Sequence, residues 1–258
     1  MRKASLDKIK ALISHIRKNC QNRKDFHSNY YFSDFKNVEL SYLINDTQDS
    51  LIFLYPSGDF YRLYFATSNL DNLAKLKTSL PEKFNGVLDV VFRNDLPKNL
   101  ALFLENNFNF HAEFRRYRTS KIKNRKTKVE FAKVEDLDNI YKSLVNNFDK
   151  FDSHFPNRNE LLNYIEDNNV LVNRTNEGIK GYIIFQIIGS TANFNYLYNN
   201  DGNSLSMPRM YSGFFTELSK REVKNVFLWV DEKNISVKEF YLKTGFQADG
   251  TIDRIYKF

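Results

Sequence analysis

The chain has 258 residues with 42% hydrophobic and 16% aromatic content, enough apolar material for the cores of two average domains. Its net charge is +7, and residues 1–122 hold most of that excess, with 19 Lys+Arg against 13 Asp+Glu. One cysteine, Cys20, excludes an internal disulfide and a CxxC metal site, the four histidines show no metal-ligand spacing, and no stretch approaches the roughly 18 apolar residues of a membrane span.

The N-terminal sequence is basic but lacks the continuous apolar core of a signal peptide. We therefore expect a soluble, cytoplasmic protein. The abundance of Asn, Lys, Phe and Tyr, with few Gly, is the usage expected of an AT-rich bacterial genome.

The first half is predicted to begin with a helix, continue with strands, and end with two helices around one strand. Apolar spacing and turn residues place these elements over a helix at 5–20, strands near 38–45 and 51–66, a helix at 69–80, a strand at 87–92 and a helix at 96–107.

The stretch 115–128, "RRYRTSKIKNRKTK", has eight basic residues and no acid. Such a segment could attract nucleic acid or another polyanion. It lacks the aromatic interleaving of a single-strand binder, so we favour a solvated strand followed by an interdomain linker. This places the predicted domain boundary between residues 122 and 123.

The second half follows a clearer pattern of strands and helices. "KVEFAKVEDLDNIYKSLVNNF" (128–148) predicts a strand, a turn and a helix, and "NNVLVNRTNEGIKGYIIFQII" (168–188) predicts a β-hairpin. The remaining elements are predicted as a strand at 191–200, a helix at 207–220, a strand at 225–230, a helix at 234–244 and a closing strand in "GTIDRIYKF". Helices that alternate with strands after an initial hairpin indicate a mixed sheet covered by helices.

The two halves also resemble each other at an offset of 138 residues. Without a gap, "GVLDVVFRNDLPKNLALFLENNF" (86–108) falls on "KNVFLWVDEKNISVKEFYLKTGF" (224–246). Both pieces predict a buried strand, a polar turn and a short amphipathic helix. The correspondence indicates two copies of one supersecondary plan.

The ending "LWVDEKNISVKEFYLKTGFQADG" resembles the closing motif of the GNAT acyltransferase superfamily. That motif is a strand, an Asn-containing turn and a helix that ends in aromatic residues, a basic residue, Gly and Phe. Here these positions are Asn234, Phe240, Tyr241, Lys243, Gly245 and Phe246. The opening "FAKVEDLDNI" is similar to the family's first strand and helix.

The resemblance implies an α/β (α+β) fold with two GNAT-like domains, each a mixed, mostly antiparallel sheet flanked by helices. The predicted domains are a degenerate GNAT-like domain at 1–122 and a GNAT acyltransferase domain at 123–258. The implied reaction moves an acetyl group from acetyl-CoA, as co-substrate and without a metal, to the primary amine of a small molecule or peptide.

The resemblance also implies where the donor binds. Its pantetheine arm would contact the main chain of Leu197, Tyr198 and Asn199. Its phosphates would lie at the loop and helix start "NNDGNSLSMPRM", because a helix N-terminus offers free N–H groups and a favourable dipole. The predicted contacts are Gly202, Asn203, Ser204, Leu205, Ser206, Met207 and Arg209, with Asn234, Tyr241 and Lys243 from the closing motif.

This loop departs from the family pattern Arg/Gln-x-x-Gly-x-Gly/Ala. The three specified positions fall on Gly202, Leu205 and Met207, none of which matches. A capped core helix is therefore the structural alternative, with Ser204 or Ser206 as N-cap and Pro208 in the first turn.

Tyr241 occupies the family's position for the acid that protonates the leaving thiolate. Its counterpart in the first copy is Phe103, and the counterpart of Asn234 is Leu96, so only the second copy keeps these polar groups. Packing in the core is the alternative role for Tyr241, and N-capping the alternative for Asn234. In the first copy, Asn107 and Phe108 are expected to form the turn that Gly245 and Phe246 form in the second.

No residue is assigned as general base. Glu166, Asp167 and His154 lie in the region that often faces the acceptor in this family, and water could also take the proton. Two other functions remain open. One is an aminoacyl-tRNA-dependent transferase of the Fem type, suggested by the lost glycines and the basic stretch. The other is a non-catalytic module that binds CoA or another ligand. The acceptor and the oligomeric state are not predicted.

Overall fold

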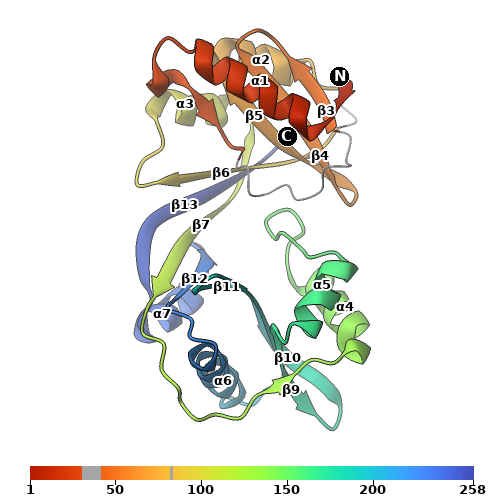
Figure 1. The fold of residues 1–258 in the computed structure, drawn as a ribbon, viewed down its shortest axis with the longest axis vertical. Helices are drawn as coiled ribbons and strands as arrows, with labels where there is room; N and C mark the ends of the chain where they lie inside the picture. Colours follow the sequence, from red (N-terminus) through yellow and green to blue (C-terminus); the bar gives the residue numbers. More distant parts are fainter. Residues whose placement is uncertain (31–41, 82–83) are drawn as a thin grey trace. The chain divides into compact units, whose positions relative to one another are not determined.

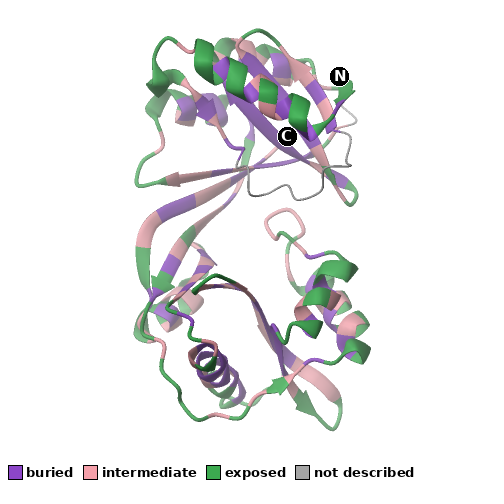
Figure 2. Ribbon diagram, viewed as in Figure 1, coloured by how far each residue is buried: buried purple, intermediate pink, exposed green. Residues whose placement is uncertain are grey.

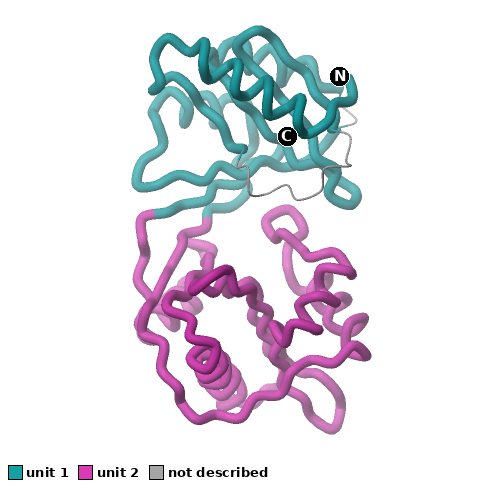
Figure 3. Tube along the Cα trace, viewed as in Figure 1, with its two compact units in different colours: residues 1–113, 251–258 teal, residues 114–250 magenta. Residues whose placement is uncertain are grey.

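The computed structural model describes residues 1–30, 42–81 and 84–258. The chain forms two compact units, drawn in different colours in Figure 3: an N-terminal unit of residues 1–113 with 251–258, and a C-terminal unit of residues 114–250. The predicted boundary at 122/123 therefore differs from the division in space. The last eight residues of the chain belong to the N-terminal unit, and 114–122 belong to the C-terminal unit.

The N-terminal unit is built from helices and a mostly antiparallel sheet with the strand order β1-β3-β4-β5-β6-β13 (Figure 1). Its elements in chain order are β1 (Arg2–Ala4), α1 (Leu6–Asn19), η1 (Arg23–Asp25), β2 (His27–Ser28), β3 (Tyr42–Asp46), β4 (Ser50–Ser57), β5 (Phe60–Thr67), α2 (Leu70–Thr78), β6 (Gly86–Arg93) and α3 (Lys98–Asn107).

The C-terminal unit has the strand order β8-β9-β10-β11-β12-β7. The elements that follow α3 along the chain are β7 (Asn109–Thr119), β8 (Glu130–Phe131), η3 (Val134–Asp136), α4 (Leu137–Asn147), α5 (Arg158–Glu166), β9 (Val170–Thr175), β10 (Gly178–Ile188), β11 (Thr191–Asn199), α6 (Ser206–Lys220), β12 (Asn225–Asp231), α7 (Ile235–Lys243) and β13 (Gln247–Lys257). β7 and β13 each begin in one unit and end in the other.

The two units share one plan. Each has an antiparallel meander, one parallel pair (β5 with β6, β11 with β12) and an antiparallel closing strand. Each sheet has a hydrophobic core on both faces. Buried residues lie along the strands of both units (Figure 2). In the N-terminal unit α1 covers one face and α2 and α3 the other; in the C-terminal unit α4 and α5 cover one face and α6 and α7 the other. The predicted architecture, mixed and mostly antiparallel sheets flanked by helices, is confirmed.

The closing strand that follows each sequence copy pairs with the sheet of the other copy. β7 follows α3, yet it pairs with β12, with Thr119 opposite Val226. β13 follows α7, yet it pairs with β6, with Lys257 opposite Val87. This exchange explains why the compact units do not follow the sequence boundary: a strand belongs in space to the sheet that binds its main chain.

Most predicted elements are present within a few residues. The prediction missed α5 and the strand β7 before residue 115, and it did not divide 51–66 into the hairpin of β4 and β5, which turns at Gly58 with φ +65°. The strand predicted near 38–45 lies partly outside the described residues. No helix in the described part of the chain is long and apolar enough to cross a membrane.

Candidate functional site

The parallel strands β11 and β12 pair only at their first residues. Thr191, Ala192 and Asn193 lie opposite Asn225, Val226 and Phe227, and no further pairs form although β11 continues to Asn199. The β10–β11 register shifts so that Asn195 is an extra residue on β11. Such a bulge bends its strand and increases the local twist. Beyond Asn193 the strand β11 diverges from β12.

The separated part of β11 exposes main-chain groups on its β12 side. The Asn200 amide donates to the Lys180 carbonyl on the β10 side, at 2.8 Å. Because main-chain groups alternate between the two edges of a strand, Tyr198 also faces β10, whereas Leu197 and Asn199 face the open edge. Of the three residues predicted to contact a donor through the main chain, only Leu197 and Asn199 therefore have main-chain groups on the open edge. The Tyr198 ring stacks on Tyr182 instead, with 5.3 Å between centroids.

In the N-terminal unit the same place is filled by the chain itself. β5 and β6 also pair only briefly, at Tyr61 and Arg62. Beyond that point β2 pairs with the free edge of β5, with His27 opposite Thr67. The Asn29 carboxamide donates to the carbonyls of Leu63 (3.0 Å) and Asp89 (3.1 Å).

Asn29 also accepts a hydrogen bond from the Phe65 amide at 2.7 Å, and its side chain is buried. One amide group thus bridges the two separating strands. The N-terminal unit shows that an amide fits this opening, while in the C-terminal unit no segment of the described chain pairs with β11 there.

The loop after β11 leads into α6 and is organised by Asp201. The Asp201 carboxylate accepts hydrogen bonds from the Ser206 hydroxyl, from the Asn203 amide at 2.8 Å and from the Asn173 side chain at 2.7 Å. Asn199 adds a longer contact of 3.4 Å. These bonds, first that of Ser206, hold the pKa of Asp201 below its usual value, so the group is charged at neutral pH.

The predicted N-cap is corrected by the structure. Leu205 occupies the N-cap position of α6 and makes no side-chain cap, whereas Ser206 is the first helical residue and Pro208 lies in the first turn as expected. Asn203 satisfies the two amides at this end: its side chain accepts from Leu205 and its carbonyl from Ser206, at 3.0 and 3.1 Å. Ser204 and Met207 have no main-chain partner for their amides within the described residues.

The other predicted donor contacts lie on the surface. Gly202 has φ +68°, which only glycine adopts without strain. Leu205 is 73% exposed, and Arg209 is exposed just inside the helix. Lys243 is exposed and forms an ion pair with Glu239 at 3.4 Å. The positive charge of Lys243 is therefore partly neutralised by a carboxylate of the same helix.

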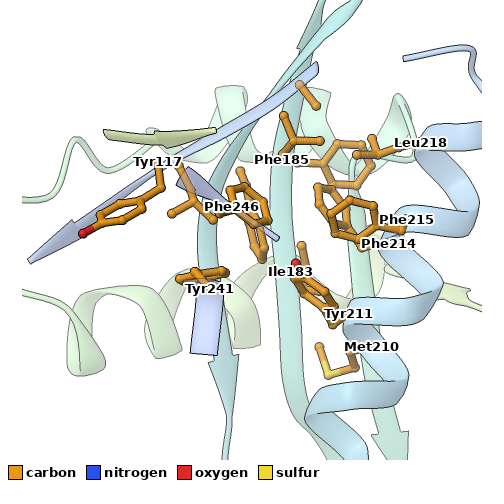
Figure 4. Close-up of a cluster of buried hydrophobic side chains, with 14 of the residues drawn as sticks. Tyr117, Ile183, Phe185, Met210, Tyr211, Phe214, Phe215, Leu218, Tyr241 and Phe246 are labelled. Carbon is orange, nitrogen blue, oxygen red and sulfur yellow. The ribbon is translucent and has the colours of Figure 1, made fainter. Parts of the chain in front are cut away.

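Tyr241 lies in the aromatic cluster on the α6 side of the sheet (Figure 4). Its ring contacts Phe246 at 5.4 Å and Phe194 of β11 at 6.1 Å between centroids. The ring is 5% exposed, and burial, with a smaller contribution from Tyr211, raises the pKa of Tyr241 well above its usual value.

The Tyr241 hydroxyl makes no hydrogen bond within the described part of the chain, yet its oxygen is not among the fully enclosed polar atoms that lack partners. An enclosed hydroxyl without a partner costs about 1–3 kcal/mol. The oxygen therefore lies where solvent or a ligand reaches it. Phe194, which its ring contacts, is the residue at which β11 leaves β12.

The end of α7 has the predicted structure, and its counterpart does not. Gly245 has φ +97°, and the Phe246 amide donates back to the Tyr241 carbonyl at 3.0 Å. Asn107 does not take a positive φ but remains in α3, which ends at Phe108 in extended conformation. The expected common turn is therefore wrong for the first copy, because a helix can also end by extending the chain.

Asn234 is the N-cap of α7, as the structural alternative proposed. Its side-chain oxygen accepts from the Val237 amide at 3.2 Å.

In the first copy Phe103 is the counterpart of Tyr241. Phe103 is buried and contacts Phe108 at 6.0 Å between centroids, so packing alone explains an aromatic residue at this position.

Much of the basic stretch 115–128 is used within the C-terminal unit. Residues 115–119 belong to β7, and Arg116 pairs with Asp249 at 2.7 Å and lies over the rings of Phe227 and Trp229. Arg125 lies over the ring of Tyr211 at 5.8 Å. The predicted strand is confirmed, but the interdomain linker is wrong, because residues 120–128 lie inside the C-terminal unit.

The sequence reasoning missed Asn29, which fills the edge of β5, and Asp201, which organises the loop after β11. Asp201 lies inside the predicted phosphate loop, and its charge was the available signal.

Of the candidate bases, His154 accepts a hydrogen bond from the Tyr196 hydroxyl through its carbonyl at 2.8 Å. The structure brings none of His154, Glu166 and Asp167 into contact with Tyr241 within the described chain.

No protein-family model and no curated relative matches this chain. Solved structures do. A GCN5-related N-acetyltransferase from Sphaerobacter thermophilus matches with a TM-score of 0.60 and 11% identity, over 97% of this chain and 91% of that one.

A GNAT-family acetyltransferase from Colwellia psychrerythraea matches over 100% of both chains, with a TM-score of 0.54 and 10% identity. A functionally unknown conserved protein from Staphylococcus epidermidis matches with a TM-score of 0.52 and 15% identity, over 88% of this chain and 97% of that one. At such identities the likeness shows the fold, and it confirms the resemblance at that level: this chain has the fold of the GNAT N-acetyltransferases.

Proposed function

We propose that the C-terminal unit is an acyltransferase that moves an acetyl group from acetyl-CoA to the primary amine of a small molecule or peptide. The observation that carries this proposal is the open edge of β11, with the Tyr241 ring packed where that edge begins. Pantetheine is an extended chain with two amides, and Asn29 shows in the N-terminal unit that an amide can hydrogen-bond to this kind of opening.

The main-chain amides of Leu197 and Asn199 supply the donors for the pantetheine arm and the thioester carbonyl. A preorganised N–H group stabilises the oxyanion that forms when the amine nitrogen attacks the carbonyl carbon. As the C–S bond breaks, the Tyr241 hydroxyl gives its proton to the leaving sulfur. The amine loses its extra proton to water, and Tyr241 regains a proton from solvent, so the step balances.

Burial affects both partners of this proton transfer. The raised pKa of Tyr241 keeps its hydroxyl protonated throughout the neutral range, which an acid requires. By itself the shift would make Tyr241 a poorer acid. The same apolar surroundings also disfavour a thiolate, because desolvation raises the pKa of any group that is charged when deprotonated. Tyr241 and the leaving sulfur are thus shifted in the same direction.

The test is calorimetry with acetyl-CoA on two variants of one residue. Leu197→Pro removes an N–H that faces the open edge and leaves the β10 ladder intact, a position where a strand tolerates proline. Leu197→Ala removes the side chain and keeps the N–H. We expect the alanine variant to bind acetyl-CoA and the proline variant to lose at least tenfold in affinity. No binding by the wild type at high micromolar concentration would overturn the proposal.

A non-catalytic module that binds the same donor is the second candidate. The consideration in its favour is that no residue of the described chain is assigned as the base that takes the proton from the amine. A screen of amines decides between the two. Release of free thiol above the hydrolysis rate with any amine supports the enzyme, whereas tight donor binding without turnover supports the module.

A further inference from the structure

We propose that Asp201 determines donor specificity, because its carboxylate occupies the place at the start of α6 where the pyrophosphate of a CoA donor would bind. This inference rests on the proposed function. That function is supported independently by the open edge of β11 and by the Tyr241 hydroxyl, neither of which involves the helix start.

Asp201 already uses the hydrogen-bond donors of this loop. One carboxylate oxygen accepts from the Asn203 amide, and the other accepts from the Ser206 hydroxyl and the Asn173 side chain. Asn203 in turn takes the amides of Leu205 and Ser206. A pyrophosphate at this place would have to replace these bonds or use the remaining amides of the loop, those of Asp201, Gly202, Ser204 and Met207, which have no acceptor among the described residues.

Charge acts in the same direction as the hydrogen bonds. The favourable dipole at a helix start attracts an anion, and Asp201 supplies one within the chain. A pyrophosphate beside Asp201 would meet like charge at the distance of a hydrogen-bonded group, and two negative groups that close repel each other. Arg209, exposed in the first turns of α6, offsets part of this repulsion but lies outside the loop.

The consequence is that the phosphates contribute little to donor affinity in the wild-type protein. The amide-bearing arm along β11 then supplies most of the binding. A donor that carries pantetheine but fewer phosphates therefore loses less affinity at this loop than it would at a loop whose amides are all free. Removing the charge of Asp201 should restore the contribution of the pyrophosphate selectively.

The experiment compares CoA with pantetheine, which lacks the pyrophosphate. Calorimetry on the wild type, Asp201→Asn and the control Glu177→Gln measures each affinity. Asparagine keeps the shape and one acceptor oxygen for the Asn203 amide. Glu177 is an exposed acid in the turn before β10, paired with Lys180 at 2.7 Å.

We expect Asp201→Asn to bind CoA about tenfold more tightly than the wild type, with pantetheine unchanged and the control like the wild type. The gain should shrink with rising salt, because screening weakens a charge effect. Equal CoA affinity in wild type and Asp201→Asn, with pantetheine bound by both, would overturn this inference and leave the proposed function standing. If neither ligand bound any variant, both would fall.

Discussion

The two units have the same strand order and differ in what lies beside the first strand of the parallel pair. In the N-terminal unit β5 pairs with β4 without a register shift, and residues 27–29 fill its other edge. In the C-terminal unit β11 carries the bulge at Asn195 and its edge stays open. One architecture thus gives a unit whose strand edge is paired and a unit whose strand edge is open.

A second difference lies on the helix that follows. Phe103 and Tyr241 are both buried aromatics packed on a phenylalanine after the helix, at 6.0 and 5.4 Å between centroids. Packing accounts for both rings. Only Tyr241 has a hydroxyl, and that hydroxyl lies in the unit whose strand edge is open. The comparison teaches that the ring is structural and that the oxygen needs another explanation.

The largest effect should come from changing that oxygen. Tyr241→Phe keeps the ring and removes the proposed acid, so acetyl transfer should slow about 100-fold or more, the usual contribution of general acid catalysis. Because burial raises the pKa of Tyr241, the difference should persist through about pH 10, where an ordinary tyrosine ionises. Steady-state rates of thiol release measure it.

The matched control places a hydroxyl in the other copy. Phe103→Tyr should leave the rate unchanged, since β5 offers no open edge beside it. An unchanged rate in Tyr241→Phe would contradict the role of the Tyr241 hydroxyl as the acid.

The second-largest expected effect is a loss of stability when the residue that fills the edge of β5 is changed. Asn29→Ala takes one buried partner from each of three main-chain groups, those of Leu63, Phe65 and Asp89. We expect the free energy of unfolding to fall by about 3 kcal/mol, from the cost of leaving buried polar groups without partners. Urea unfolding followed by circular dichroism measures this change.

The control is Asn45→Ala, which removes an exposed hydrogen bond to Ser79 in the same unit. It should cost less than about 1 kcal/mol. Equal losses in the two variants would mean that Asn29 does not hold β5 and β6 as described.

The smallest effect separates the two helix ends. Gly245 has φ +97°, and a Cβ there would meet only the Lys121 side chain at 3.4 Å, so Gly245→Ala should cost about 1 kcal/mol through backbone strain alone. Asn107→Ala, at the counterpart with ordinary helical backbone, should cost clearly less. Thermal unfolding compares them, and a larger loss at Asn107 would contradict the different helix ends.

The sequence predicted the strand and helix order of the C-terminal half because its apolar spacing is regular and its turns carry glycine or asparagine. It also predicted the region of the open edge, through the positions of Leu197 and Asn199. The bulge at Asn195 could not be predicted, since it depends on the register of β10 against β11. The exchange of β7 and β13 was equally hidden, because either strand pattern satisfies either sheet.

Asn29 illustrates a further limit. Its role depends on contacts with residues 34 to 60 positions away, and nothing in its local sequence distinguishes it from other asparagines. Asp201 could have been recognised as an acid in a predicted phosphate loop. Its partners Asn173 and Ser206 come together only when β9 and α6 are placed.

The most direct test of the central claim is amide hydrogen exchange with and without acetyl-CoA, followed by mass spectrometry. The claim is that the open edge of β11 binds the donor and the filled edge of β5 does not. It predicts slower exchange over residues 195–207, with residues 61–67 unchanged. Protection over 61–67 without protection over 195–207, or no change anywhere at saturating acetyl-CoA, would contradict it.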